Sequence, residues 1–483
     1  MKIIIIYDNS IPKNEVIADI IGNKGFGDVV VRKQHIEDYI YNKMETLFNN
    51  VIWEKINYSI EYASLLEYIQ NYYDDDIRIL HYFSNYYISD FEKALLSFEK
   101  LLYIDEPYKY LFDKKVAGLM FPNAKTYLQY CNNIMAGQNI QDATDYIKNS
   151  FETEGLIDLS QIDNFIHCLT SNADTRYFNQ LKDNEFKMTK TSVDKLKIKK
   201  EYTFYKLIPD EMKSWFVMPY NYKETDETAS YTMERFYMTD LAIKYVHGSI
   251  DETKFNNILN KYFYFFKIRS SRTCSKEKYK QNANDLYDKK LKQRIGELKA
   301  HNEFIRINKF LSAGNIDLDE ILTKYFTLKD KIESKINEPS IEVIGHGDPG
   351  FANTLYNQAT QMMKFIDPKG ALTEEELWTD PYYDVAKLSH CVCGKYDFFN
   401  NGMFDIRINE KFEYILEIPF DNNQFKEMFK QKAIENGFNY DKIRLYEASL
   451  FLSMLPLHID NPFKVLGFIL NAKDILEEIE NNV

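Results

Sequence analysis

The spacing of apolar residues in the first third of the chain predicts strands that alternate with helices. Residues 3–7 form an unbroken aliphatic run typical of a buried parallel strand, and residues 29–31 and 77–83 repeat the pattern. A helical segment at 65–72 precedes the last of these runs. This alternation predicts a doubly wound, Rossmann-like α/β domain. The polar stretch 132–145 marks its end, so we expect the domain to span residues 1–145.

The pattern changes after residue 160. Residues 165–192 contain three short runs, "FIHCLT", "RYFNQL" and "FKMTKTS", joined by turn-like segments, which predicts three antiparallel strands. A helix is expected at 195–207, and strand-like pieces follow at 215–218 and 231–235. Beyond Leu241 the spacing is helical except in a Gly/Pro-rich stretch. The order predicts an α+β region: a small antiparallel sheet with one helix at 146–240 and a large helical lobe at 241–483.

The charge balance limits the partners of the chain. The 483 residues carry a formal net charge of -13, and the sequence pI is near 5.3. An acidic chain of this kind is a poor general binder of nucleic acid or of anionic membranes, so we expect neither as a partner. A nucleotide substrate is compatible with this charge, because one lysine and a metal ion suffice to hold its phosphates.

The cysteines and the N-terminus indicate a cytoplasmic protein. The five cysteines lack the spacing of a disulfide framework, which favours a reducing compartment. Cys391 and Cys393 lie near His390, but no further ligand pair completes a tetrahedral zinc site. The apolar run at the N-terminus is too short for a signal peptide or a membrane span.

The Gly/Pro-rich stretch carries the most informative chemistry. It reads "IGHGDPGFANTL" at 344–355, and "FIDPKG" follows at 365–370. Asp348, Asn353 and Asp367 supply the carboxylate and amide oxygens that magnesium prefers, together with a carboxylate able to accept a hydroxyl proton. A surface turn with solvated acidic residues would have the same composition. The surrounding sequence must decide between the two.

"HGDPGFAN" followed by "FIDPKG" resembles the HGDxxxxN…IDxxG signature of the aminoglycoside phosphotransferase and choline kinase family, which has a bilobal protein-kinase-like fold. The resemblance implies that Asp348 is the catalytic base, that Asn353 and Asp367 bind magnesium, and that His346 braces the loop. "DPYYDVAKL" at 380–388 resembles the helix after the family's metal loop, which implies that Asp384 anchors the catalytic loop.

Residues upstream resemble the ATP-holding parts of the same family. "FKMTKTS" offers Lys190 for the donor phosphates, with Lys187 as the alternative that strand alternation leaves open. Glu201, early in the following helix, resembles the glutamate that pairs with this lysine; a solvated helix face is the alternative.

Two further segments complete the expected cofactor site for ATP or GTP. "SYTMERF" resembles the hinge strand, where backbone groups near Glu234 and Phe236 would bind the adenine edge. "SNAD", which begins at Ser171, lies where the phosphate-covering loop belongs, although it lacks the glycines of protein kinases.

The N-terminal region is less specific. No GxGxxG follows a predicted strand, and no Walker A sequence is present. The acidic run 74–76 precedes a strand and is best interpreted as a turn. The region faintly resembles a nucleotide-sugar or nucleotidyltransferase-type α/β domain, and Asp8, at the end of the first strand, is its one candidate site residue.

Other segments allow several interpretations. The basic run 267–292 is expected to be a solvated helical insertion, although Arg269 and Arg272 could meet a substrate phosphate. Trp378, Tyr382 and Tyr383 would either line the acceptor pocket or pack in the core.

The sequence thus predicts a cytoplasmic, ATP- and magnesium-dependent transferase: a kinase that phosphorylates a hydroxyl of a small molecule, a sugar or an amino alcohol. The pairing of the two regions suggests, by analogy, a role in cell-surface polysaccharide biosynthesis. A non-catalytic kinase-fold scaffold and a bifunctional kinase and nucleotidyl- or glycosyltransferase are the alternatives. The acceptor and the oligomeric state stay open.

Overall fold

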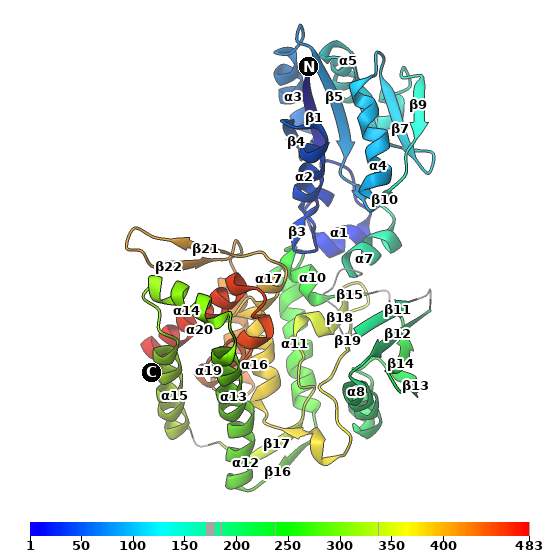
Figure 1. The fold of residues 1–483 in the computed structure, drawn as a ribbon. Coiled ribbons are helices and arrows are strands. Elements are labelled where there is room, and N and C mark those ends of the chain that lie inside the picture. The colour runs from blue at the N-terminus through cyan, green and yellow to red at the C-terminus, as the bar shows by residue number, and fades with distance from the viewer. Residues whose placement is uncertain (171–178, 184–185, 237, 337, 483) are drawn as a thin grey trace. The chain divides into compact units, whose positions relative to one another are not determined.

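The computed structural model describes residues 1–170, 179–183, 186–236, 238–336 and 338–482. It divides into two compact units, each considered by itself. The N-terminal unit comprises Met1–Ala173 with His247–Ser249, and the C-terminal unit comprises Asp174–Val246 with Ile250–Val483. Figure 1 shows the N-terminal unit in blue to cyan and the C-terminal unit from green to red.

A six-stranded sheet forms the centre of the N-terminal unit, in the order β4-β1-β5-β8-β7-β9. Its strands are β1 (Lys2–Asp8), β4 (Ile52–Ile56), β5 (Ile77–Phe83), β7 (Tyr108–Phe112), β8 (Lys115–Phe121) and β9 (Asn149–Glu152). The accompanying helices are α1 (Glu15–Ile21), α2 (Ile36–Phe48), α3 (Tyr62–Gln70), α4 (Phe91–Phe98), α5 (Ala124–Met135), α6 (Ile140–Ala143) and α7 (Ile162–Thr170); short strands are β2 (Val30–Val31), β3 (Gln34–His35), β6 (Tyr86–Ile88) and β10 (Leu156–Asp158).

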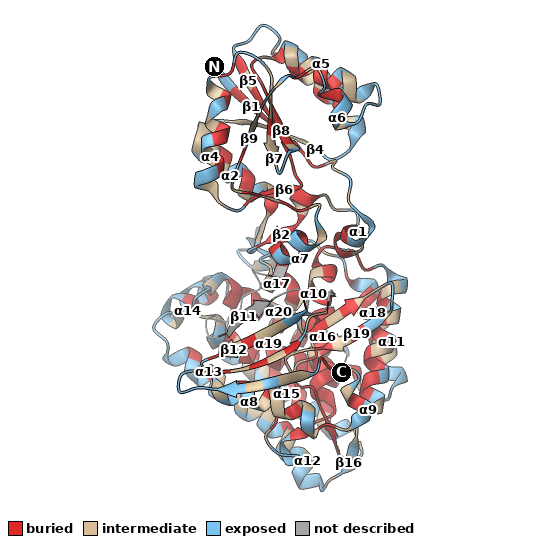
Figure 2. Ribbon diagram, turned by 90° about the vertical axis from the view of Figure 1, so that its right-hand side faces the viewer, coloured by how far each residue is buried: buried red, intermediate tan, exposed pale blue. Residues whose placement is uncertain are grey.

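The sheet is mixed, so the expected Rossmann-like domain is not confirmed. β1 pairs in parallel with β4 and β5, and six of its seven residues are buried, as an aliphatic run requires. β8, in contrast, is antiparallel to both β5 and β7. The β7–β8 turn places Asp113 and Lys114 at positive φ, the geometry of a tight two-residue hairpin. Figure 2 shows the buried strands of this sheet in red.

The predicted boundary at residue 145 falls too early. β9 adds to the sheet by pairing in parallel with β7, and α7 also belongs to the N-terminal unit. The prediction of a strand at "FIHCLT" is therefore wrong, because this run lies in α7. Its apolar residues Ile162, Phe165, Ile166 and Leu169 follow helical spacing.

The C-terminal unit begins with a four-stranded antiparallel sheet in the order β11-β12-β14-β13. Its strands are β11 (Asn179–Asp183), β12 (Lys187–Ser192), β13 (Pro219–Glu224) and β14 (Ala229–Glu234). α8 spans Lys195–Leu207, the range predicted from the sequence, and α9 spans Asp210–Lys213. The strand expected at 215–218 was placed too early in the sequence, because β13 begins at Pro219.

The rest of the unit is mostly helical, as its spacing predicts. The helices are α10 (Leu241–Val246), α11 (Glu252–Ile268), α12 (Lys276–Ala283), α13 (Lys290–Ala300), α14 (Phe304–Ala313), α15 (Leu318–Lys335), α16 (Tyr382–Val392), α17 (Tyr396–Asn400), α18 (Asn423–Glu435), α19 (Tyr440–Ser453) and α20 (Pro462–Asn482). Short strands are β15 (Thr239–Asp240), β16 (Ser271–Thr273), β17 (Ile341–Ile344), β18 (Thr354–Asn357), β19 (Met362–Phe365), β20 (Trp378–Thr379), β21 (Asp405–Ile408) and β22 (Tyr414–Glu417).

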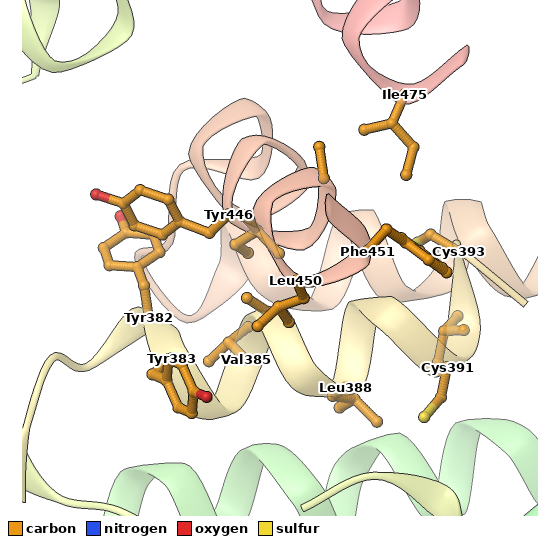
Figure 3. Close-up of a cluster of buried hydrophobic side chains, with 14 of the residues drawn as sticks. Tyr382, Tyr383, Val385, Leu388, Cys391, Cys393, Tyr446, Leu450, Phe451 and Ile475 are labelled. Atoms are coloured by element: carbon orange, nitrogen blue, oxygen red, sulfur yellow. The ribbon is translucent and has the colours of Figure 1, made fainter. Parts of the chain in front are cut away.

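α16 lies in the core of this unit. Ten of its eleven residues are buried, and Figure 3 shows Val385 and Leu388 of α16 close to Leu450 of α19. A helix packed on this scale has little freedom to shift, so it is a rigid support for whatever its polar side chains hold. Within the described part of the chain, no helix combines the length and the apolarity needed to cross a bilayer.

Candidate functional site

The loop that follows β17 is fixed from α16. The carboxylate of Asp384 accepts hydrogen bonds from the backbone N–H of His346 at 2.9 Å and of Gly347 at 2.8 Å. Arg269 donates to the same carboxylate at 2.9 Å, and both side chains are buried. A buried carboxylate needs such a set of donors. The loop therefore rests on a charged anchor within the core.

His346 connects this loop to Ile366, the residue directly after β19. Its Nδ1 accepts from the backbone N–H of Asp348 at 3.1 Å, and its Nε2 lies 3.0 Å from the carbonyl oxygen of Ile366. Because Nδ1 accepts, Nε2 carries the proton and donates. Burial lowers the pKa of His346, which keeps the ring in this neutral form. These are the contacts of a bracing residue.

Asp348 projects from the loop with its side chain 47% exposed. Its Oδ1 lies 3.0 Å from Nζ of Lys387, a mostly buried lysine one turn after Asp384 on α16. The sequence reasoning missed Lys387, although "DPYYDVAKL" places it three residues after the anchor. Since α16 is fixed in the core, the ion pair orients the Asp348 carboxylate.

Asn353 lies at the end of the same loop. Its side-chain amide nitrogen donates to the backbone carbonyl oxygen of Asp348 at 3.0 Å, and the backbone carbonyl oxygen of Asn353 accepts from the N–H of Ile366. The first bond fixes the amide with its nitrogen toward the loop, so its oxygen is the group suited to a ligand. Asp348 and Asn353 thus belong to one hydrogen-bonded loop, braced from β19.

Asp367 follows β19 and lies near the sheet of the unit. Its φ of 55° is in the left-handed region, which is uncommon for a residue other than glycine. Its Oδ1 lies 2.8 Å from Nζ of Lys190 on β12, and that ammonium also donates to Glu201 of α8 at 2.8 Å. Residues 190, 201 and 367 are thus brought together from three elements.

The ion pair of Lys190 and Glu201 is almost entirely buried, with side-chain exposures of 4% and 1%. Burial alone would lower the pKa of Lys190, but the carboxylates of Asp367 and Glu201 outweigh burial and raise it. Tyr231 of β14 donates to Glu201 at 2.9 Å, to the same carboxylate oxygen, Oε2, that accepts from Lys190. Lys187, the alternative lysine, is exposed at the start of β12 and lies opposite Glu234.

Gly370 explains how the Asp367 loop reaches this pair. Its φ is 81°, and a Cβ there would lie 2.5 Å from the backbone carbon of Lys200. Ala371 then donates to the carbonyl of Lys200 at 3.1 Å. Only glycine permits so close an approach of two backbones. The "FIDPKG" loop therefore lies against α8, the helix that carries Glu201.

The other predicted nucleotide contacts lie at or beyond the end of β14. Glu234 is its last residue and is exposed, and Phe236 is partly buried against the core of the small sheet. Ser171 lies outside the described residues, as does the rest of "SNAD".

Several predicted residues have structural partners. Arg269 belongs to the Asp384 anchor, while Arg272 pairs with Glu342 and Glu375 and stacks 4.3 Å from the Trp378 ring. The solvated helical insertion expected at 267–292 is wrong in part, since Arg272 lies in β16 and Arg269 is buried. Tyr382 and Tyr383 are buried on α16.

Asp8 lies in a buried network of the N-terminal unit. Its Oδ2 accepts from Tyr62 at 2.8 Å and lies 3.3 Å from Nε2 of His81, while Ser10 donates to Oδ1. Burial would raise the pKa of Asp8, but His81 and Ser10 lower it overall. Its carboxylate therefore has partners within the protein.

The donor set suits magnesium carried by a nucleotide. Asp367 and Asn353 provide one carboxylate and one amide oxygen, which match the one or two protein ligands that magnesium takes beside phosphates. Among the described residues, no three His, Cys, Asp or Glu side chains gather as a metal centre. A magnesium site that phosphate oxygens complete does not need three such side chains.

Comparisons with known proteins give distant structural likenesses only. No protein-family model and no curated protein matches the chain. Among solved structures, aminoglycoside phosphotransferase APH(4)-Ia aligns at a TM-score of 0.36 and 11% identity, over 65% of this chain and 97% of that one. Spectinomycin phosphotransferase APH(9)-Ia, in complex with ADP and spectinomycin, aligns at 0.35 and 9%, over 63% and 91%. Likenesses at this level do not establish a family.

Proposed function

We propose that the C-terminal unit is a magnesium- and ATP-dependent kinase that phosphorylates a hydroxyl group of a small molecule. The observation that carries the proposal is the convergence of Lys190, Glu201 and Asp367 through contacts of 2.8 Å. Phosphoryl transfer needs a lysine for the donor phosphates, an acid that fixes it, and a carboxylate for the metal. A convergence of residues 190, 201 and 367 supplies these three groups in one place.

Each residue has a definable task in this reaction. Mg·ATP supplies the phosphoryl group and part of the charge neutralisation when bound. Lys190, held by Glu201, binds donor phosphate oxygens, and Asp367 with the amide oxygen of Asn353 holds the metal. Backbone groups near Glu234 and Phe236 meet the base edge. GTP would fit the same phosphate contacts.

Asp348 acts on the acceptor. Its carboxylate orients the acceptor hydroxyl and takes its proton as the hydroxyl oxygen bonds to phosphorus and the nucleoside diphosphate leaves. Lys387 and the brace from His346 keep the carboxylate in place. Positioning of this kind is most of what an enzyme contributes to phosphoryl transfer.

Replacement of the proposed base tests the function. We expect Asp348→Asn to lower magnesium-dependent ATP turnover by about 10³-fold, since the amide cannot accept the proton. Turnover would be measured over a panel of alcohols and sugars, with circular dichroism to verify folding. Asp460→Asn, at an exposed aspartate of the same unit, is the matched control.

Undiminished turnover in Asp348→Asn would contradict the assignment of the base. If the unaltered protein binds Mg·ATP yet forms no phosphorylated product from any acceptor, the unit is instead a nucleotide-binding protein without kinase activity.

A further inference from the structure

Three lysines gather beside the proposed base, and we call them the acceptor-side lysines: Lys290, Lys369 and Lys387. Lys387 lies 3.0 Å from Asp348, and Lys290 lies 3.3 Å from the hydroxyl of Tyr383. Lys369 passes so close to the catalytic loop that a Cβ on Gly347 would lie 2.5 Å from its own. They come from α13, α16 and the loop after β19, so the fold brings them together from distant parts of the sequence.

Tyr383 reports the electrostatic potential at this point. Burial would raise the pKa of its hydroxyl, but the charges of Lys387, Lys290 and Lys369 outweigh burial and lower it below the ordinary value, with Asp348 opposing them. Burial likewise would lower the pKa of Lys387, yet Asp348 raises it. Lys387 is therefore held in its charged form, and the potential around Tyr383 is positive.

The cluster lacks enough negative charge of its own. Neither Lys290 nor Lys369 forms an ion pair with a described residue, and Lys387 pairs with Asp348, the proposed base. The three ammonium groups thus share one ion pair, with Asp348, although Glu376 lies within electrostatic range of Lys369. Like charges repel, most strongly where a side chain is shielded from water, as Lys387 is, so a bound anion would relieve the repulsion. Clusters of this kind at a reactive group are typical of ligand sites.

We propose that the acceptor-side lysines bind an anionic group of the phosphate acceptor, so that the substrate is an alcohol carrying a phosphate or a carboxylate. The inference rests on the proposed kinase function and restricts its acceptor to anionic alcohols. With the anion held by these lysines, the hydroxyl of the same molecule lies against Asp348. An amino alcohol, one of the acceptors expected from the sequence, would bring a cation to a positive site and is disfavoured.

A binding experiment tests the site without any turnover. Glycerol 3-phosphate, inorganic phosphate and glycerol would each be titrated calorimetrically into the protein saturated with Mg·ADP. We expect both anions to bind and glycerol to bind far more weakly. Lys290→Met and Lys369→Met should each weaken anion binding about tenfold, the loss of one charged hydrogen bond. Lys290→Arg, which keeps the positive charge, should retain the anion affinity of the unaltered protein. Lys309→Met, at an exposed lysine of α14, is the matched control.

Equal anion affinity in the lysine variants and in the unaltered protein would overturn the inference, as would glycerol binding as tightly as its phosphate. A turnover experiment separates the acceptor's anion from the transferred phosphoryl group. The ratio of kcat/KM for glycerol 3-phosphate over glycerol, and for gluconate over glucose, should fall about tenfold in Lys290→Met.

If the lysines instead hold the transferred group, both members of each pair lose activity equally and the ratio stays constant, which also overturns the inference. Anion binding that depends on the lysines, in a protein that never consumes ATP, would leave the anion site in place and reject the kinase function. The two failures are therefore distinguishable.

Discussion

At the scale of single residues, Lys190 is the most constrained group of the site. Its ammonium lies between Glu201 and Asp367, and only Asp367 of the three is appreciably exposed. A buried ion pair gains little over an apolar pair, yet a buried charge that loses its partner is costly. Stability alone therefore gives little reason for the pair, whereas the proposed phosphate binding requires it.

This difference leads to a testable expectation. Lys190→Met should reduce the free energy of unfolding by about 3 kcal/mol, because the buried Glu201 loses its closest counter-charge and keeps only the Tyr231 hydroxyl and the more distant Lys197. The double variant Lys190→Met/Glu201→Met should recover most of that loss, while both variants lose Mg·ATP affinity. Urea unfolding and nucleotide titration measure the two effects. Lys187→Met, at the exposed lysine of the same strand, should change stability by less than about 0.5 kcal/mol.

If the double variant is as unstable as the single one, the loss comes from packing around β12 and the charge argument is wrong. Weaker nucleotide binding in Lys187→Met than in Lys190→Met would reverse the choice between the two lysines.

At the scale of elements, α16 unites the acceptor half of the proposed site. Its Asp384 holds the backbone of the loop that carries Asp348, its Lys387 holds the carboxylate of Asp348, and its apolar residues fix the helix against α19 (Figure 3). The donor half depends on other elements, namely β12 and α8. Damage to α16 should therefore affect the chemical step more than nucleotide binding.

Asp384→Asn separates these two halves. The amide has one acceptor oxygen for three donors and leaves Arg269 without its counter-charge, so we expect kcat to fall about 10²-fold as the loop shifts. KM for ATP should rise by a smaller factor than kcat falls, because Asn353 shares the displaced loop whereas Lys190 and Glu201 lie on other elements. Steady-state kinetics with varied ATP measures both, and Asp330→Asn on the exposed face of α15 is the control. A rise in KM for ATP with unchanged kcat would contradict the division.

The elements also show what the sequence could predict. α8 was predictable over its full length, because Asp194 caps it and a long helical pattern follows. The helical structure of "FIHCLT" was not predictable, because a short apolar run fits a strand as well as a buried helix. Asp113 and Lys114 form the turn of the β7–β8 hairpin. This pair lacks the Asn-Gly or Asp-Gly signal of such turns, so the hairpin could not be recognised from the sequence.

The residues of the proposed site could be chosen from the sequence where a motif resemblance marks them, but not where only the fold brings them together. Asp348, Asn353 and Asp367 are recognisable from their spacing in the sequence. Lys290 belongs to no motif, and Lys387 lies within "DPYYDVAKL" without being marked by the resemblance; their relation to Asp348 arises from the packing of α13 and α16. Strand alternation could not choose Lys190 over Lys187; the position of α8, which brings Glu201 to Lys190, distinguishes them in the structure.

At the scale of the whole molecule, acidic groups inside the C-terminal unit link folding to pH. Burial raises the pKa of Asp380 to about 6 and that of Asp397 to about 7, and each has an oxygen without a hydrogen-bond partner. Burial also favours the neutral form of His390, but for this basic group it does so by lowering the pKa. The folded chain therefore retains protons on some carboxyl groups at a pH where the unfolded chain has lost them.

Asp397 should give the largest effect of this kind. Its pKa in the folded chain, about 7, lies above the ordinary value of 3.8, so its contribution to stability is fully present below about pH 4 and is lost as pH rises through 7. Asp397→Asn, which cannot ionise, should escape this loss. Relative to the unaltered protein, the variant should gain up to about 4 kcal/mol between pH 4 and pH 7. Urea unfolding across that range measures the difference, in which His390 cancels because both proteins contain it. Asp460→Asn should show no such gain, and parallel pH profiles for Asp397→Asn and the unaltered protein would mean that Asp397 is ionised in the folded chain well below pH 7.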